Sequence, residues 1–233
     1  MSTMSTLHRH FDGILDAFQQ SPAIAAIADG RFTIAHYKSI LREIYYYARE
    51  NPQIQALAAV YFRGEDRGMV RPFFRHALSE IGHDRLALDD LAALGETVSE
   101  IPHQQPLPST IGMVAYPFYQ IQHLNPVGYL GYLFFLEFTP TSAADRYMAY
   151  LTKIGVPAGA QTFLNEHAKV DIQHNKWMEG YAESLIRTDA DLESVVYAMR
   201  VTGSLYARML DGAMRHAESP EARDRCLPEP RRA

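Results

Sequence analysis

The stretch from residue 167 to residue 174, His167-Ala-Lys-Val-Asp171-Ile-Gln-His174, decides the fold. Its polar side chains follow one another at intervals of four and three, which place all three on one face of an α-helix. The surrounding residues 158–186 have the apolar spacing of one long helix, and helical periodicity dominates the remaining chain. Strand-like alternation is nearly absent. The sequence therefore predicts an all-α bundle of seven to eight helices joined by short loops.

The other predicted helices follow from the same periodicity and from turn residues. Asn51-Pro52 should kink or break the second helix, because proline lacks a backbone donor and clashes with the preceding turn. Gly95 should end the third helix, and a proline-rich loop follows it. The expected helices are residues 7–18, 33–61, 67–94, 109–124, 127–138, 141–154, 158–186 and 191–216.

Composition excludes several classes of protein. The formal net charge is -5, so the chain lacks the cationic surface that nucleic acid or an anionic membrane would select. Residues 101–136 contain no Asp, Glu, Lys or Arg, yet their prolines cut them into pieces too short to span a membrane. The one cysteine, Cys226, cannot form an internal disulfide, and the N-terminus lacks the features of a signal peptide. We expect a cytoplasmic protein with one domain at residues 1–217 and a flexible tail at residues 218–233.

A second segment repeats the spacing of the first. His76, Glu80 and His83 also stand at intervals of four and three, so both segments contain a carboxylate followed three residues later by histidine. Helices that face one another with such units can hold two cations, and comparable di-iron bundles use a glutamate from each of two further helices. Glu137 is one candidate, because it is the first charge after the uncharged segment. The other is Glu43 or Glu50, and the spacing does not choose between them.

The donor types limit the metal. Carboxylates and imidazoles without a thiolate disfavour a structural zinc site and suit non-haem iron or manganese. His76 is interpreted as a neighbour of the ligands rather than as a ligand. The remaining histidines, Tyr45 to Tyr47 and Trp177 are interpreted as packing or surface residues.

These residues resemble the haem-oxygenase-like di-iron oxidases, a group that shares the haem oxygenase and TenA-like fold and binds iron without porphyrin. The resemblance rests on the Glu-x-Gly-His stretch within residues 79–84, on Glu137, and on the His/Asp/His spacing of residues 167–174. It extends from about residue 7 to residue 216. By this resemblance the metal ligands would be Glu80, His83, Glu137, His167, Asp171 and His174.

The resemblance also implies an activity. Two Fe(II) ions per chain, with O2 as co-substrate, would oxidise a small organic metabolite such as an amino acid, an amine or a fatty acid. The reactions of the group are N-oxygenation, carbon-carbon cleavage, desaturation and decarboxylation. Glu80, Glu137 and His174 would be catalytic, with Glu137 bridging or holding both irons. The uncharged helices would line the substrate cavity through Tyr116, Phe118, Tyr119, Tyr129, Tyr132, Phe134 and Phe135.

Two alternatives remain at this point. A ferritin-like iron-binding or storage protein also uses a glutamate followed by Glu-x-x-His, although His167 adds a nitrogen ligand which that pattern lacks. A non-catalytic helical interaction protein would need none of these residues. The sequence shows no nucleotide fingerprint, so electrons would come from the substrate or from an external reductase. It identifies neither the substrate nor whether the chain forms a homodimer.

Overall fold

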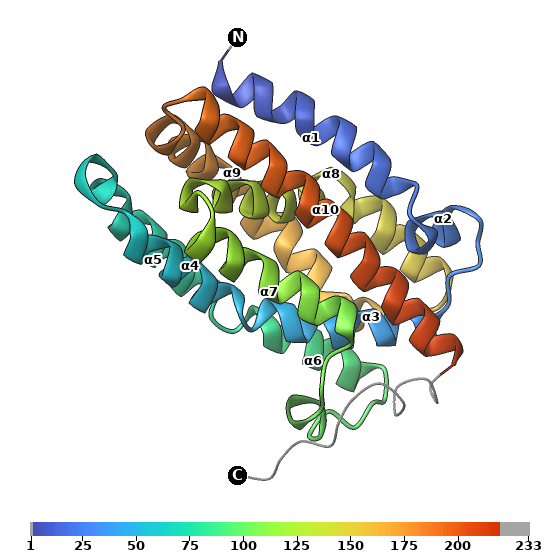
Figure 1. Ribbon diagram of the computed structural model, residues 1–233. Coiled ribbons are helices and arrows are strands. Elements are labelled where there is room, and N and C mark those ends of the chain that lie inside the picture. The colour runs from blue at the N-terminus through green and yellow to red at the C-terminus, as the bar shows by residue number, and fades with distance from the viewer. Residues whose placement is uncertain (1, 220–233) are drawn as a thin grey trace.

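The computed structural model describes residues 2–219, which form ten α-helices and four short 3-10 helices without a strand (Figure 1). The all-α prediction is therefore confirmed, whereas the predicted tail lies almost entirely outside the described residues. The α-helices are α1 (Thr3–Gln19), α2 (Pro22–Ala28), α3 (Ile34–Ala48), α4 (Asn51–Tyr61), α5 (Val70–Glu80), α6 (His83–Ala93), α7 (Pro108–His123), α8 (Tyr129–Lys153), α9 (Thr162–Leu185) and α10 (Asp189–Glu218).

Helix α8 forms the centre of the bundle and packs against both α9 and α10. Its first half is almost wholly buried, including Phe134 and Phe135. Gly131 is required there, because a Cβ atom at this position would collide with the backbone carbonyl of Val195 and lie 2.6 Å from the backbone nitrogen of Met199. This close approach of α8 and α10 fixes the position of the helix that carries Glu137.

The prediction of a single helix over residues 67–94 is wrong. Residues 64–69 form a 3-10 helix, α5 ends at Glu80, and α6 begins at His83. Gly82 between them has a φ of +99°, a left-handed conformation that favours glycine and ends a right-handed helix. Glu80 and His83 therefore come from two helix ends that meet, and not from one helical face.

One proline coincides with a helix break, whereas another lies inside a continuous helix. The break predicted at Asn51-Pro52 is confirmed, since α3 ends at Ala48 and α4 begins at Asn51. The helices predicted over residues 127–138 and 141–154 are instead one helix, α8, with Pro140 inside it. Pro140 removes one backbone hydrogen bond, but burial of the helix between α9 and α10 keeps it continuous.

Two buried carboxylates hold helix N-termini in place. Asp90 of α6 accepts hydrogen bonds from the backbone N–H groups of Thr162 and Phe163 and from the Thr162 hydroxyl at the start of α9. Glu43 of α3 accepts hydrogen bonds from the Leu107 N–H and the Thr110 hydroxyl at the start of α7. Both carboxylates thus satisfy N–H groups that have no partner within their own helices. The α6 contact fixes the helix that carries three of the predicted ligands.

Within residues 2–219 no helix combines the length and apolar character that a membrane crossing requires.

Candidate metal centre

Four helices bring the predicted ligands together in the bundle interior. Helices α5 and α6 meet there at the Gly82 turn, and α8 and α9 lie against them. Five of the side chains are buried, whereas His83 and His167 are half-buried. The contributions are His76 and Glu80 from α5, His83 from α6, Glu137 from α8, and His167, Asp171 and His174 from α9.

The first donor group surrounds Glu137. Its Oε1 atom lies 3.1 Å from His76 Nε2, and its Oε2 atom lies 3.0 Å from His174 Nδ1. Glu80 Oε1 completes the group at 3.5 Å from His174 Nδ1 and 3.8 Å from His76 Nε2. One ligand atom from each of these four residues lies within 4.8 Å of the others, so the group could hold one metal ion.

The second donor group shares Glu80 with the first. Glu80 Oε2 lies 3.4 Å from His83 Nδ1, and the rings of His83 and His167 are 4.8 Å apart. The three residues again offer ligand atoms within 4.8 Å of one another. The two oxygens of Glu80 therefore face different groups. The hydrogen bonds of Glu137 to His76 and His174 lie in the first group.

Asp171 adds a third carboxylate beside the first group. Its Oδ1 atom lies 3.7 Å from His174 Nδ1, and the side chain is only 1% exposed. Burial and the neighbouring Glu137 carboxylate, which hydrogen bonds to it, raise the pKa of Asp171 to about 11. The pKa of Glu137 is lowered: burial opposes ionisation, but hydrogen bonds to His174 and His76 outweigh it. Without a metal ion, Asp171 therefore keeps a proton that Glu137 has lost.

Hydrogen bonds outside the cluster orient two histidines. The Nδ1–H group of His167 donates a hydrogen bond to the carbonyl of Phe163, which lies 2.8 Å away and one turn earlier in α9. The Nε2 atom, which faces the cluster, therefore carries no proton and can bind a metal ion. His174 Nε2 contacts the Ser79 hydroxyl at 3.3 Å, which leaves Nδ1 toward the carboxylates. Such outer hydrogen bonds are typical of metal-binding histidines.

The histidine pKa values follow from the same surroundings. Burial tends to lower the pKa of His83 and His174, but the carboxylates of Glu80 and Glu137 outweigh it and raise both values. The pKa of His167 is lowered, first by burial and then by the adjacent charge of His83. His167 is consequently neutral and able to coordinate a metal near neutral pH.

Neither glutamate expected to complete the ligand set lies in these groups. Glu43 is directed to the start of α7, and Glu50 pairs with Arg49 at 2.9 Å. Within the described residues, the ion pairs of the three cluster carboxylates are made with histidines and not with lysine or arginine.

The known proteins similar to this chain share its fold. A family model described as an iron-containing redox enzyme matches residues 38–207. The chain belongs to this iron-containing redox enzyme family. The resemblance noted in the sequence is thus confirmed.

Solved structures agree with the family match. A Shewanella denitrificans domain of unknown function with a heme oxygenase-like fold is 26% identical, with a TM-score of 0.87 over 94% of this chain and 95% of that chain. A TenA homologue from Pyrococcus furiosus is 13% identical, with a TM-score of 0.72 over 91% of this chain and 100% of that chain. A TenA homologue from Pseudomonas syringae pv. tomato is 11% identical, with a TM-score of 0.71 over 92% and 93%. A comparison with curated protein sequences finds no significant match.

The donor set fits the iron of this family. Three carboxylates and four histidines lie together in the bundle interior, and oxygen and imidazole donors suit ferrous iron. The Nδ1 atom of His76 is buried without a hydrogen-bond partner. Burying several carboxylates costs several kcal/mol unless cations compensate their charge. The cluster is therefore a candidate iron site within an iron-containing family.

Two residues contribute more to the site than their sequence pattern indicates. His76 is fully buried and contacts Glu137 directly, so it belongs to the first donor group; its spacing of four from Glu80 was the available signal. Trp177, the only tryptophan, stacks on His174 with ring centroids 5.1 Å apart and an interplanar angle of 26°. Its outer face carries the guanidinium of Arg75 at 4.9 Å. Trp177 therefore joins the candidate site to the protein surface.

The aromatic residues expected to line the substrate cavity do not line the cavity beside the cluster. Tyr129, Tyr132, Phe134 and Phe135 are instead buried in the core at 0–1% exposure. The cavity that includes Glu80, Glu137 and His167 has a volume of about 60 Å³ and is completed by side chains such as Tyr47 and Tyr206. The cavity beside the cluster thus lies on the α3, α9 and α10 side of Glu137.

Proposed function

We propose that the protein is a non-haem di-iron oxidase or oxygenase that uses O2 to oxidise a small organic molecule. The observation that carries this proposal is the pair of donor groups, each with ligand atoms within 4.8 Å of one another, that share Glu80. A single structural ion would not need two such groups. Membership of the iron-containing redox enzyme family supports the choice of iron.

The donor groups suggest how two ions would be held. Glu137, His174 and Asp171 would hold one ion, with His76 either coordinating it or hydrogen bonding to Glu137. His83 and His167 would hold the other, and Glu80 would contact both. Bound ferrous ions would supply electrons and open coordination positions for the reduction of O2.

The surrounding residues would control protons and water. Asp171 holds a proton that it must release when a cation binds, so metal binding would release this proton from the cluster. The Phe163 carbonyl fixes the ring of His167, which lines the small cavity together with Glu80 and Glu137. A cavity of about 60 Å³ would take O2 and the reacting end of a substrate.

The electron balance determines which partners are needed. Reduction of O2 to water takes four electrons, and oxidation of one substrate by two electrons supplies half of them. The other two would come from an external reductase, or from a second two-electron oxidation of the substrate. A reductase is therefore proposed as a partner, and its identity is not specified by the site.

The experiment is oxygen consumption by the iron-loaded protein with and without organic substrates. Glu80→Ala and His174→Ala should each abolish substrate-dependent uptake, whereas exposed Glu183→Ala and His123→Ala should preserve it. Iron oxidation that continues without any organic substrate would instead indicate storage. Unchanged substrate-dependent uptake in both cluster variants would exclude these residues from the reaction.

A further inference from the structure

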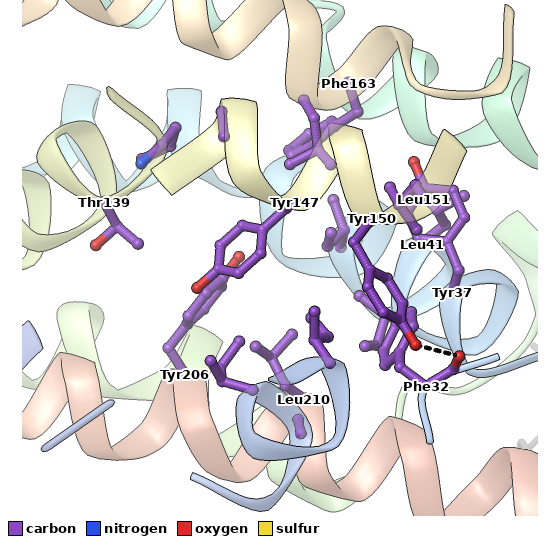
Figure 2. A pocket seen from close by; sticks show the side chains of 18 of the residues that line it. Phe32, Tyr37, Leu41, Thr139, Tyr147, Tyr150, Leu151, Phe163, Tyr206 and Leu210 are labelled. Carbon is purple, nitrogen blue, oxygen red and sulfur yellow. Dashed lines mark hydrogen bonds between the residues drawn. The ribbon is translucent and has the colours of Figure 1, made fainter. Parts of the chain in front are cut away.

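A second cavity, which we call the distal chamber, lies next to the candidate metal centre. It has a volume of about 110 Å³ and is enclosed by α2, α3, α8, α9 and α10, with Phe18 of α1 at its edge. In Figure 2, Thr139 lies at the left of the labelled residues and Phe32 and Tyr150 lie at the right, with Tyr147 and Tyr206 between them. The chamber is not part of either donor group.

The lining of the distal chamber carries no charged group. Among the described residues that form it, none is acidic, basic or histidine. Several of its hydroxyl groups already have partners in the protein: Tyr37 donates to the Ala160 carbonyl, and Tyr150 donates to the Phe32 carbonyl (Figure 2). Thr139 donates to the carbonyl of Phe135. Apart from the hydroxyl of Tyr147, which among the described residues is buried without a hydrogen-bond partner, the surface left for a ligand is apolar. A charged group placed there would lose its hydration without compensation.

The distal chamber and the metal-centre cavity share a wall. Thr139 and Pro140 of α8, Phe163 and Leu164 of α9, and Tyr206 of α10 line both spaces. On the α8 side, Thr139 and Pro140 lie within one turn of Glu137. The two spaces are therefore adjacent on the side of Thr139 and Tyr206.

The opposite side of the distal chamber approaches the surface. A surface depression lined by Asp16, Gln19, Gln20 and Arg146 shares Ile24 and Tyr147, among others, with the chamber. The short helix α2 covers this side. The chamber and the surface depression are therefore adjacent beside α2.

We propose that the distal chamber binds the uncharged apolar group of the substrate while the atom to be oxidised lies beside Glu80, Glu137 and His167. Apolar cavities of roughly 150 Å³ hold a benzene molecule. The chamber of about 110 Å³ reaches that size only with the adjoining metal-centre cavity of about 60 Å³, so the two together take a substrate with an aryl or branched alkyl group and about six carbon atoms in all. The substrate class is then a small amphiphile with one polar reacting end. This inference rests on the proposed function for its reacting end.

Binding to the chamber can be measured without metal. Fluorobenzene titrated into the metal-free full-length chain, followed by fluorine NMR, should show saturable binding of one molecule. Ala144→Leu places extra atoms in the chamber and should weaken binding by about tenfold or more, while neighbouring Ala143→Leu, which does not line it, should not. Absence of saturable binding, or equal loss in both variants, would overturn the proposal.

A second pair of variants keeps the test decisive if Ala144→Leu does not fold. Leu210→Ala enlarges the chamber and should improve binding of 4-fluoro-n-butylbenzene relative to fluorobenzene. Leu133→Ala, which removes an equally buried side chain outside the chamber, should leave this ratio unchanged. An unchanged ratio in Leu210→Ala would contradict the assignment.

A separate measurement tests whether the chamber lies beside the metal centre. Mn(II), which accepts the same donors, should accelerate the relaxation of the fluorine signal of bound fluorobenzene, and electron paramagnetic resonance should count the bound ions. Bound Mn(II) without such relaxation would overturn the proposed adjacency. Failure of Mn(II) to bind would instead contradict the proposed function, while the metal-free titration still decides whether the chamber binds an apolar group.

Substrate preference completes the test. With iron-loaded protein, hexanoate should stimulate oxygen uptake more than adipate, or hexylamine more than 1,6-diaminohexane, because the second charge would enter the chamber. Equal stimulation by a singly and a doubly charged member of an active pair would overturn the substrate class. Ala144→Leu should reduce the preferred response, and Ala143→Leu should not.

Discussion

Replacement of Asp171 by asparagine should stabilise the metal-free protein. A buried carboxyl with a pKa of about 11 stays protonated in the folded chain, whereas the same group ionises near pH 3.9 after unfolding. The folded state therefore binds more protons than the unfolded state, so this group lowers the free energy of unfolding as pH rises from about 4 toward 11. An amide cannot ionise and does not contribute this loss.

The size of the stability difference depends mainly on the pKa of this carboxyl in the unfolded chain. At pH 7 the unfolded carboxyl lies about three pH units above its pKa, and each unit is worth about 1.4 kcal/mol, which gives an upper value of about 4 kcal/mol. The stability difference between Asp171→Asn and the wild type should grow by about 1.4 kcal/mol per pH unit between about pH 5 and pH 9. Ferrous iron should reverse the order, because a deprotonated Asp171 can serve as a ligand and asparagine is a weaker one.

Urea unfolding in a chelating buffer, repeated across this pH range, measures the difference. The exposed Asp145→Asn variant on α8 is the matched control and should show no pH-dependent difference from the wild type. A stability difference for Asp171→Asn that does not change with pH, or a destabilised variant at pH 8, would refute the assignment of the proton to this residue.

Three further changes test the arrangement of the fold and the site. Gly131→Ala should lower the free energy of unfolding in urea by more than about 3 kcal/mol, because its Cβ would meet the α10 backbone. Helical Gly180→Ala, with open space around it, should be neutral or stabilising. Equal effects of the two substitutions would contradict the close packing. Glu43→Gln should lower stability by about 1–3 kcal/mol without changing the number of bound irons, and a lost iron would restore Glu43 as a ligand. His83→Ala should reduce iron binding from two ions to one in an anaerobic titration, and two retained ions would contradict the second donor group.

The part of the site on α9 could be predicted because α9 is a regular helix. His167, Asp171 and His174 keep the spacing of one helical face from sequence to structure. Glu80 and His83 are not on one helix, because Gly82 separates the end of α5 from the start of α6. Side-chain spacing alone does not distinguish three residues within a helix from three residues across such a turn.

Other features depended on tertiary packing. Glu43 was a reasonable ligand candidate as a buried acid, but its direction is set by the N-terminus of α7, which lies far along the chain. Residues 101–136 are apolar on every side of their helices, so periodicity does not reveal which face meets a cavity. The distal chamber arises where α2 and α10 meet the second half of α8, and no single segment contains its pattern.

The number of ferrous ions bound per chain tests the central claim most directly. Trp177 is the only tryptophan and stacks on His174, so its fluorescence reports ions that bind beside that ring. Anaerobic titration with Fe(II) should quench this fluorescence and saturate near two ions per chain, as expected for two donor groups sharing Glu80. A fluorescence signal that stays constant, with no iron retained by the chain, would contradict the existence of a metal centre at this position.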